Sequence, residues 1–425
     1  MKSSAISYYA ATAHSAPGRP ALQGEITCDV CIIGAGYSGL STALHLAEGG
    51  HKVVILEAET TGFGASGRNG GQIINGYSRD FDTIRGHYGA PTAQALLNMG
   101  FEGGDIIRER IEKYKIDCDY RRGSFFAAFN ESQMQYLERR GEIWHQAGNT
   151  ELKLLAKEDI PKIVDTNLYC GGLLDLRGGH IHPLNLALGE AAAFESIGGK
   201  IFEKSRVLRI AQGDKPAAYT ASGKVNANFL VICGNAYLGE TVPQLSGKIM
   251  SVSSQIVTTE ILGPDLAKKI LPADFCVEDC NYLLDYYRLT ADHRLLFGGG
   301  VVYSGNTPAD IIERLQPHIV KTFPILKDKK IEFAWSGNFA LTLTRMPHIG
   351  RLSDTVYFIQ GDSGHGVTTC HLLGKLVAEA ISHQSSRFDV FASLKHFPFP
   401  GGRMFCVPLT ALGAWYYGIK EKLGL

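Results

Sequence analysis

The stretch CDVCIIGAGYSGLSTALHLAEGGHKVVILEAE, residues 28–59, decides the fold. Its apolar opening predicts a buried strand over 29–33, and the spacing of apolar residues over 38–48 predicts a helix with one buried face. A second strand is expected over 52–56, after two glycines that end the helix. A strand, a helix and a second strand joined in this way form the βαβ unit of a parallel sheet, so we predict an α/β fold.

The turn between the first strand and the helix has the spacing GxGxxG. In a dinucleotide site Gly34 makes the tight turn, Gly36 admits a pyrophosphate to the backbone, and Gly39 lets the helix pack against the strand. The pyrophosphate lies at the helix N-terminus, where free N–H groups and a partial positive charge favour an anion. Glu57, which closes the second strand, would accept hydrogen bonds from a ribose. We therefore predict a bound nucleotide cofactor; the alternative is a glycine turn without a ligand.

A second glycine-rich segment, GFGASGRNGGQ at residues 62–72, follows this unit directly. It favours FAD over NAD, because FAD is longer and its second half must also be held against the protein. Ser66, Asn69 and Gln72 can donate or accept hydrogen bonds there. The alternative is a flexible surface loop. No second GxGxxG follows, so we expect the organic substrate itself to reduce the flavin.

Length and composition exclude several classes of protein. The chain has 425 residues, which indicates two domains, and 45% of its residues are hydrophobic, as in globular proteins. Lysine plus arginine equals aspartate plus glutamate, at 42 each, so no nucleic-acid partner is expected. No apolar run has the length of a signal peptide or a membrane span, and the nine cysteines are scattered. We predict a cytoplasmic protein without a metal site.

Two C-terminal motifs complete a resemblance to a known family. VYFIQGDSGHGVTTCHLLGKLVAEAI (356–381) has the pattern of a strand, a glycine turn and a helix, and WSGNFALTLTRMPHIG (335–350) precedes it. With the N-terminal motif, these stretches resemble the D-amino-acid oxidase superfamily of FAD-dependent amine and amino-acid oxidoreductases. Further stretches are similar to bacterial members of that superfamily that oxidise gamma-glutamylated polyamines. They are SYYAAT (7–12), FEGGDIIRERI (101–111), GGHIHPLNLA (178–187), NYLLDYYRLTADHRLLFGGGVVY (281–303) and FPFPGGR (397–403).

The resemblance implies a Rossmann-like FAD-binding domain with a discontinuous antiparallel-sheet substrate domain, as in D-amino-acid oxidase and glycine oxidase. The segment 281–303 supports the antiparallel sheet by itself, since a polar turn separates two strand patterns. The FAD-binding domain would comprise residues 25–90, 155–240 and 335–385. The substrate-binding domain would comprise residues 91–154 and 241–334, and residues 386–425 would form a C-terminal extension.

The glycine motifs and the resemblance together indicate which residues contact FAD. The C-terminal helix would direct its N-terminus at the flavin pyrimidine, and Val207 would give backbone bonds to adenine. Some relatives attach the flavin to a cysteine in the stretch from Trp335 to Gly350; none occurs there, so we predict non-covalent FAD. The candidate cofactor-binding residues are Gly34, Ala35, Gly36, Tyr37, Ser38, Gly39, Glu57, Ala58, Ala65, Ser66, Arg68, Asn69, Gly70, Gly71, Gln72, Val207, Gly361, Ser363, Gly364, His365, Gly366, Val367 and Thr368.

The resemblance also implies a small-molecule amine substrate, the primary amine of a gamma-glutamylated polyamine such as gamma-glutamylputrescine. Oxidation would give an aldehyde and ammonia, and molecular oxygen would become hydrogen peroxide. Phe339 stands where amino-acid oxidases often carry an arginine for a carboxylate, which favours a simple amine. His365 is the candidate for tuning the flavin or transferring a proton. The substrate-binding candidates are Gln72, Tyr286, Tyr287, Asn338 and Phe339; Glu278, Asp279 and Asp285 could attract an ammonium group.

Three other functions remain open at the level of sequence. An FAD dehydrogenase could pass electrons to a quinone or a carrier protein instead of oxygen. A flavin-binding module could lack enzymatic activity, although a substrate sheet argues against it. An amino-acid oxidase is disfavoured by Phe339. The sequence does not fix an oligomeric state.

Overall fold

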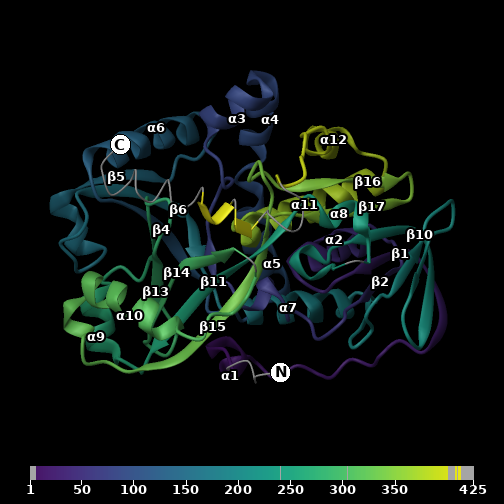
Figure 1. The fold of residues 1–425 in the computed structure, drawn as a ribbon, viewed down its shortest axis with the longest axis horizontal. Coiled ribbons are helices and arrows are strands. Elements are labelled where there is room, and N and C mark those ends of the chain that lie inside the picture. The colour runs from purple at the N-terminus through teal and green to yellow at the C-terminus, as the bar shows by residue number, and fades with distance from the viewer. Residues whose placement is uncertain (1–5, 240, 304, 401–406, 409, 413–425) are drawn as a thin grey trace.

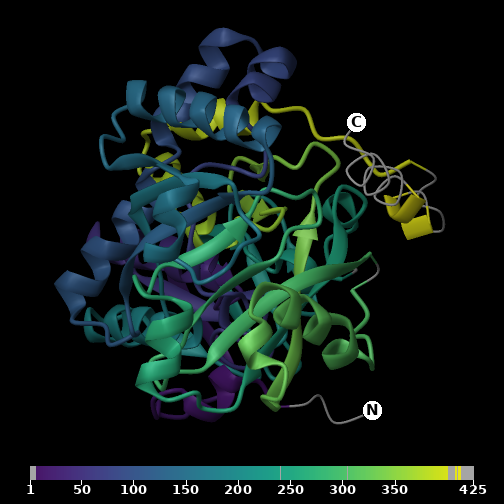
Figure 2. The same cartoon turned by 90° about the vertical axis from the view of Figure 1, so that its left-hand side faces the viewer.

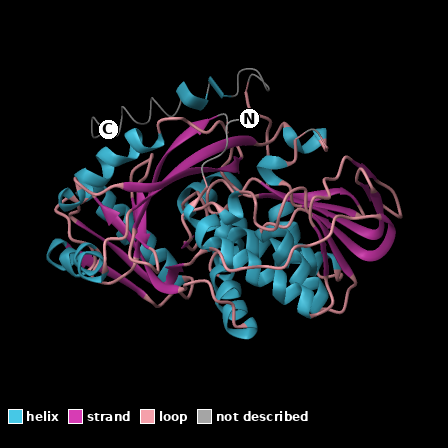
Figure 3. Ribbon diagram, turned by 90° about the horizontal axis from the view of Figure 1, so that it is seen from below, coloured by secondary structure: helices cyan, strands magenta, loops and turns pink. Residues whose placement is uncertain are grey.

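The computed structural model describes residues 6–239, 241–303, 305–400, 407–408 and 410–412 (Figure 1). The rest of the expected C-terminal extension, 401–406, 409 and 413–425, lies outside the described residues. Two sheets stand on opposite sides of the molecule, and helices fill much of the space between them (Figure 3). Among the described residues, no helix combines the length and the apolar character that a membrane span requires.

The first sheet is built around the predicted βαβ unit. Its strands are β1 (Gly24–Ile33), β2 (Val53–Leu56), β7 (Lys200–Phe202), β8 (Arg209–Ala211), β9 (Ala217–Tyr219), β10 (Gly223–Ile232), β16 (His348–Ser353) and β17 (Val356–Gln360). The order is β16-β17-β10-β1-β2-β7, parallel except for β16 at one edge, and β8 and β9 extend it antiparallel beside β10. Helices and loops cover both faces, so the central strands are apolar on both sides.

The second sheet is mostly antiparallel. Its strands are β3 (Gln72–Ile73), β4 (Arg121–Ala128), β5 (Leu152–Ala156), β6 (Gly171–His180), β11 (Met250–Thr259), β12 (Cys276–Asp279), β13 (Tyr286–Leu289), β14 (Leu295–Tyr303) and β15 (Ile331–Leu341). The order is β15-β11-β14-β13-β12-β4-β6-β3, with β5 beside β6, and β12 and β4 are its parallel pair. The strand pair predicted within residues 281–303 is confirmed as β13 and β14.

The helices divide between the two sheets. They are α1 (Tyr8–Thr12), α2 (Tyr37–Glu48), α3 (Phe81–Tyr88), α4 (Ala90–Met99), α5 (Glu102–Tyr114), α6 (Glu131–Gln146), α7 (Pro183–Ser196), α8 (Pro243–Ser246), α9 (Pro264–Ile270), α10 (Ile311–Thr322), α11 (Gly366–Ile381) and α12 (Ser386–Ala392). Short 3-10 turns are η1 (Ala65–Gly67), η2 (Lys157–Lys162), η3 (Asn235–Tyr237) and η4 (Pro324–Leu326). α2, α5, α7 and α11 pack together on the first sheet, and α9 and α10 cover the outer face of the second, the side seen in Figure 2.

The expected domain boundaries remain a prediction, but sheet membership differs from them at three strands. β3, β6 and most of β15 fall in segments expected in the FAD-binding domain, yet all three belong to the second sheet. The reason is pairing across long sequence distances: β6 pairs with β4 and β3, and β15 pairs with β11. The chain therefore passes between the two sheets at the glycine-rich segment 62–72, which places this segment between them.

Candidate functional site

A cavity of about 1050 Å³ runs from the GxGxxG turn of the first sheet to the inner face of the second. This volume lies at the upper end of the range for sites that bind small molecules. Its wall includes the N-terminal ends of α2 and α11, the glycine-rich segment 62–72, one face of the second sheet and one side of α6. The cavity therefore joins the predicted cofactor residues to the predicted substrate residues.

The glycines of the turn are required by their neighbours. Gly34 has φ +111°, and a side chain there would place a Cβ 2.8 Å from the carbonyl oxygen of Cys233. A Cβ on Gly39 would lie 2.0 Å from the carbonyl oxygen of Gly34, so α2 could not pack this closely on β1. Gly36 is the first residue before α2 and has extended backbone, and with Ser38 it opens the helix N-terminus to the cavity. This arrangement fits a pyrophosphate.

Glu57 is fixed at the end of β2 by two backbone amides. Its Oε2 accepts a hydrogen bond from the amide of Ala35 at 2.7 Å, and its Oε1 accepts one from Glu59 at 2.8 Å. Burial raises the pKa of this carboxyl, and the two amides oppose that effect. Each oxygen keeps a lone pair that can accept a hydrogen bond from a ribose hydroxyl. Val207 lines the same end of the cavity, so an adenosine fits there.

The glycine-rich segment 62–72 is a fixed part of the cavity wall. The side-chain amide of Asn69 donates to the carbonyls of Ala65 and Ser66, both at 2.9 Å. The second sheet holds the segment from behind: Arg288 donates to the carbonyl of Gly70 at 2.7 Å, and the indole of Trp335 donates to that of Arg68 at 3.0 Å. These bonds tie the segment to itself and to the second sheet, which argues against a flexible surface loop.

The turn before α11 completes the cofactor side of the cavity. His365 precedes α11 and lines the cavity, and its Nδ1 is buried without a hydrogen-bond partner among the described residues. Burial, with a smaller contribution from the charge of Arg140, lowers the pKa of His365 to about 4. The imidazole is therefore neutral at pH 7, and it can donate or accept a hydrogen bond but holds no proton to release as an acid. A buried polar atom without a partner fits a polar atom of the flavin ring.

One face of the second sheet forms the part of the wall that carries the predicted substrate residues, called the substrate side below. Cross-strand pairing puts Ile256, Gly298, Tyr286, Glu278 and Phe126 in one row across β11, β14, β13, β12 and β4. Directly paired residues share a face of the sheet, and of this row all but the side-chain-free glycine line the cavity. The sheet therefore presents two aromatic rings with a carboxylate between them.

Tyr287 is a substrate-binding candidate that the structure places elsewhere. It lies on the opposite face of β13, where its ring stacks on Phe297 at 5.5 Å and its hydroxyl is 3.0 Å from that of Tyr169. Asp285 also lies outside the cavity wall and pairs with His318 at 2.7 Å. Alternation of side chains along a strand separates neighbours in this way.

The other predicted residues divide by their distance from the cavity. The substrate candidates Gln72, Tyr286, Asn338 and Phe339 line it, as does Asp279. Most predicted cofactor residues line it too. Four do not, namely Ala35, Gly39, Gly71 and Gly361. Their backbone shapes the wall from behind, as the close contact of Gly39 with Gly34 illustrates.

Several lining residues had no motif in the sequence. α6 contributes Tyr136, Arg140 and Trp144, and the loop after β10 contributes Asn235, whose amide donates to Asp362 at 2.9 Å. α6 has the pattern of an ordinary surface helix, and its contact with the cavity depends on how it packs against β4 and β6. A cation on a polar helix face gave no basis for assigning Arg140 to the site.

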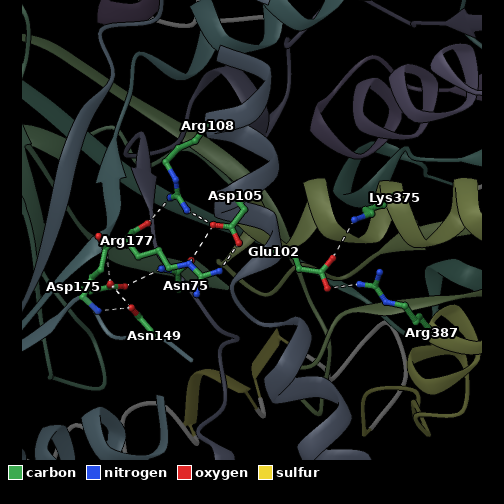
Figure 4. Close-up of polar contacts among 10 residues, drawn as sticks. Asn75, Glu102, Asp105, Arg108, Asn149, Asp175, Arg177, Lys375 and Arg387 are labelled. Atoms are coloured by element: carbon green, nitrogen blue, oxygen red, sulfur yellow. Dashed lines mark hydrogen bonds and ion pairs between the residues drawn. The ribbon is translucent and has the colours of Figure 1, made fainter. Parts of the chain in front are cut away.

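Residues 102–111 of the stretch FEGGDIIRERI lie in α5, which polar contacts join to α11, α12 and β6 (Figure 4). Glu102 pairs with Lys375 of α11 at 3.3 Å and with Arg387 of α12 at 2.5 Å, whereas Asp105 pairs with Arg177 of β6. A Cβ on Gly103 would lie 2.0 Å from the carbonyl oxygen of Thr368, so α5 packs directly on the first turn of α11. These contacts hold the turn before α11 at a fixed position relative to the second sheet.

Within the described ranges, no group of three or more histidine, cysteine, aspartate or glutamate side chains is placed to hold a metal ion. The donor set of the cavity is that of an organic cofactor: backbone amides at a helix N-terminus, one fixed carboxylate and a glycine-rich segment. FAD fits these residues, and no cysteine lies between Trp335 and Gly350 to bind it covalently.

Comparisons with known proteins agree with this geometry. A family model described as FAD dependent oxidoreductase matches residues 29–380. Gamma-glutamylputrescine oxidoreductase of Escherichia coli (strain K12) is 54% identical over 420 residues, which are 99% of each chain. A probable oxidoreductase, OrdL, of Haemophilus influenzae is 40% identical over 93% of this chain and 92% of its own.

Solved structures confirm the predicted fold class. Glycine oxidase from Geobacillus kaustophilus superposes with a TM-score of 0.70 at 22% identity, over 87% of this chain and 99% of its own. L-proline dehydrogenase from P. horikoshii superposes with a TM-score of 0.72 at 20% identity, over 87% and 96%. Identities this low establish the shared fold and carry no information about substrate.

Proposed function

The chain belongs to the FAD-dependent oxidoreductase family, and on that premise we propose that it oxidises the primary amine of a gamma-glutamylated polyamine such as gamma-glutamylputrescine. The amine loses two electrons and two protons to become an imine, and water hydrolyses the imine to an aldehyde and ammonia. Molecular oxygen takes up the two electrons and two protons as hydrogen peroxide. Full-length similarity to the E. coli enzyme named for this substrate supports the choice.

The observation that carries the proposal is the single cavity shared by cofactor and substrate residues. FAD supplies the two-electron acceptor when it is bound. The amides at the start of α2 would bind its pyrophosphate, Glu57 would bind its ribose, and the turn at His365 would lie against its ring. The row of Tyr286, Glu278 and Phe126 forms the opposite wall, where an amine with a carbon chain can bind.

Non-covalent attachment of FAD and the division into an FAD-binding and a substrate-binding domain belong to the same proposal. Phe339 lines the cavity as an apolar residue, which favours an amine without a carboxylate at the reacting carbon.

The protonation state of the amine sets the pH dependence. A lysine-like amine has a pKa near about 10.4, and only its neutral form has the lone pair from which the carbon–hydrogen bond can be oxidised. Deprotonation at neutral pH costs about 4 to 5 kcal/mol, at about 1.36 kcal/mol per pH unit. His365 is neutral and does not add positive charge beside the amine. We expect the rate of flavin reduction to rise toward alkaline pH.

The test is anaerobic mixing of the purified holoenzyme with gamma-glutamylputrescine, putrescine, spermidine, glycine and D-alanine, followed by the visible flavin absorbance. Rapid bleaching by the glutamylated amine supports the proposal, and bleaching by glycine or D-alanine alone contradicts it. Admission of air and assay of peroxide then identifies the acceptor. Bleached flavin that persists in air would instead indicate transfer to a quinone or a carrier protein.

A further inference from the structure

Glu278 is unusual among the acidic side chains of the cavity wall. It has no hydrogen-bond donor and no cation partner among the described residues. Every other acidic residue of the wall already has one, from a backbone amide, a side-chain amide or a basic side chain. These residues are Glu57, Glu59, Asp80, Asp82, Asp279 and Asp362. A carboxylate left in this state inside a protein is costly unless a ligand supplies the missing donor.

Arg140 is the corresponding exception among the arginine side chains of the cavity wall. Its guanidinium lies 4.1 Å from the ring centre of Phe126 and 4.2 Å from that of Trp144, and it has no hydrogen-bond acceptor among the described residues. The other arginines of the wall all donate to an oxygen of the protein. They are Arg68, Arg79, Arg139, Arg206 and Arg345. Within the described part of the chain, the cavity wall thus holds one acidic side chain and one arginine that lack a hydrogen-bonded partner.

The carboxylate of Glu278 and the guanidinium of Arg140 lie at different distances from the glycine-rich segment 62–72. Tyr286 contacts that segment, since a Cβ on Gly70 would lie 2.6 Å from its ring. Glu278 is paired with Tyr286 on the neighbouring strand, and Phe126, under Arg140, is paired with Glu278 on the strand after that. Adjacent strands are about 4.8 Å apart. The carboxylate is therefore nearer to the glycine-rich segment 62–72, and the guanidinium is farther from that segment along the wall.

We infer that Glu278 binds the ammonium group at the reacting end of the substrate and that Arg140 binds the carboxylate of its glutamyl cap. The inference rests on the proposed function, because gamma-glutamylputrescine carries these two groups at opposite ends. The rings of Tyr286 and Phe126 flank Glu278 and can pack on the carbon chain between the charged groups. Each pairing replaces a missing contact in the free protein, so both contribute to the choice of substrate.

The environment of Glu278 agrees with a role in binding a cation. Burial raises the pKa of Glu278 to about 7, and Arg140 opposes that rise. An ammonium group beside the carboxylate stabilises its ionised form, so the substrate itself favours the charge state that binds it.

The test compares two variants on two substrates. Glu278→Gln and Arg140→Met are assayed with gamma-glutamylputrescine and with putrescine, which has no carboxylate. Controls are Asp285→Asn and Arg314→Met, at residues that both lie outside the wall and pair with His318 and Asp310, respectively. Bound FAD and thermal stability are measured for each holoenzyme, and Glu278→Asp and Arg140→Lys are included as conservative variants.

The expected results differ between the two positions. Glu278→Gln raises the dissociation constant of both substrates, measured from the concentration dependence of flavin reduction, by about tenfold to about a hundredfold, the range for a lost hydrogen bond between charged groups. Arg140→Met lowers kcat/KM by about tenfold or more for gamma-glutamylputrescine and by less than about twofold for putrescine. Both controls retain wild-type values, and each conservative variant recovers part of the loss.

Two results would overturn the inference. A loss in Glu278→Gln that is confined to the glutamylated substrate would place Glu278 at the α-ammonium of the cap instead of the reacting amine. An equal loss for both substrates in Arg140→Met would show that Arg140 does not read the carboxylate.

The inference can fail independently of the proposed function. If no amine reduces the wild-type flavin, the proposed function fails, and charge recognition is then measured with the unreactive probes butyltrimethylammonium and glutarate. The probes are titrated against the flavin spectrum of the oxidised holoenzyme. Weaker butyltrimethylammonium binding in Glu278→Gln alone, and weaker glutarate binding in Arg140→Met alone, support the two assignments. Unchanged affinities refute them.

Discussion

Replacing Glu278 by glutamine should stabilise the free protein at alkaline pH, although it removes a native charge. The pKa of this carboxyl is raised by burial from 4.5 to about 7. Between these values the folded protein holds more protons than the unfolded chain, so the free energy of unfolding falls as pH rises. The decrease in the free energy of unfolding begins near pH 4.5, the ordinary pKa of the carboxyl, and continues until the pH exceeds about 7, its pKa in the folded protein. At about 1.36 kcal/mol per pH unit it amounts to about 3 kcal/mol, and water in the cavity lowers that figure. Glutamine does not titrate, so the variant keeps this stability.

The assay is thermal unfolding of the FAD-free protein at about pH 5 and about pH 8. Unfolding entropy of about 2.1 cal/mol/K per residue gives about 0.9 kcal/mol/K for this chain, so about 3 kcal/mol corresponds to about 3 °C. Glu278→Gln should unfold about 3 °C above wild type at the higher pH and close to wild type at the lower one. Asp285→Asn, seven residues along the chain and paired with His318, should show no such gain.

The reasoning is refuted if Glu278→Gln has the wild-type unfolding temperature at both pH values. That result would mean that the carboxylate of Glu278 is hydrated or paired in the free protein, so it would not need a cation from the substrate to be stabilised. A gain of equal size at both pH values would also contradict the reasoning, since it would arise from packing and not from ionisation.

Three further predictions test other parts of the structure. Gly39→Ala puts a Cβ 2.0 Å from the carbonyl oxygen of Gly34, so the purified protein should lose most of its bound FAD, and a full complement of flavin by absorbance would contradict this. Glu190→Gln removes the carboxylate that lies 2.8 Å from the buried guanidinium of Arg110. Denaturant unfolding should show that the free energy of unfolding falls by about 3 to 5 kcal/mol, and a decrease below about 1 kcal/mol would count against this prediction. Burial lowers the pKa of several histidines, such as His180, to about 3, so on acidification the unfolded chain binds protons before the folded protein does. The free energy of unfolding should therefore fall below about pH 6.5, by up to about 1.4 kcal/mol per pH unit for each histidine. An unfolding temperature that stays constant from about pH 6.5 to about pH 5 would contradict this prediction. These histidines are His45, His180, His182 and His348.

The sequence alone determined the cofactor side of the molecule. The turn at Gly34, Gly36 and Gly39 needs glycine for reasons of local geometry, and the residues that impose them lie within one βαβ unit. The second glycine-rich segment and the turn before α11 are also short stretches with their own composition. Local spacing therefore predicted the Rossmann-like sheet and the residues assigned to FAD, most of which line one cavity, and it located the strands β13 and β14 on either side of their turn.

Only the tertiary structure decided which charged and aromatic side chains face the substrate side of the cavity. Alternation along the strand shows that Tyr286 and Tyr287 point to opposite faces of the sheet. Which face packs against α10 and which lines the cavity depends on tertiary packing. Glu278, Asp279 and Asp285 were equivalent in the sequence, and the structure places Glu278 and Asp279 on the cavity wall and Asp285 outside it. Arg140 reaches the wall from α6, far from Glu278 along the chain. Contacts between distant segments depend on which surfaces the whole fold buries, so a local pattern of residues cannot predict them.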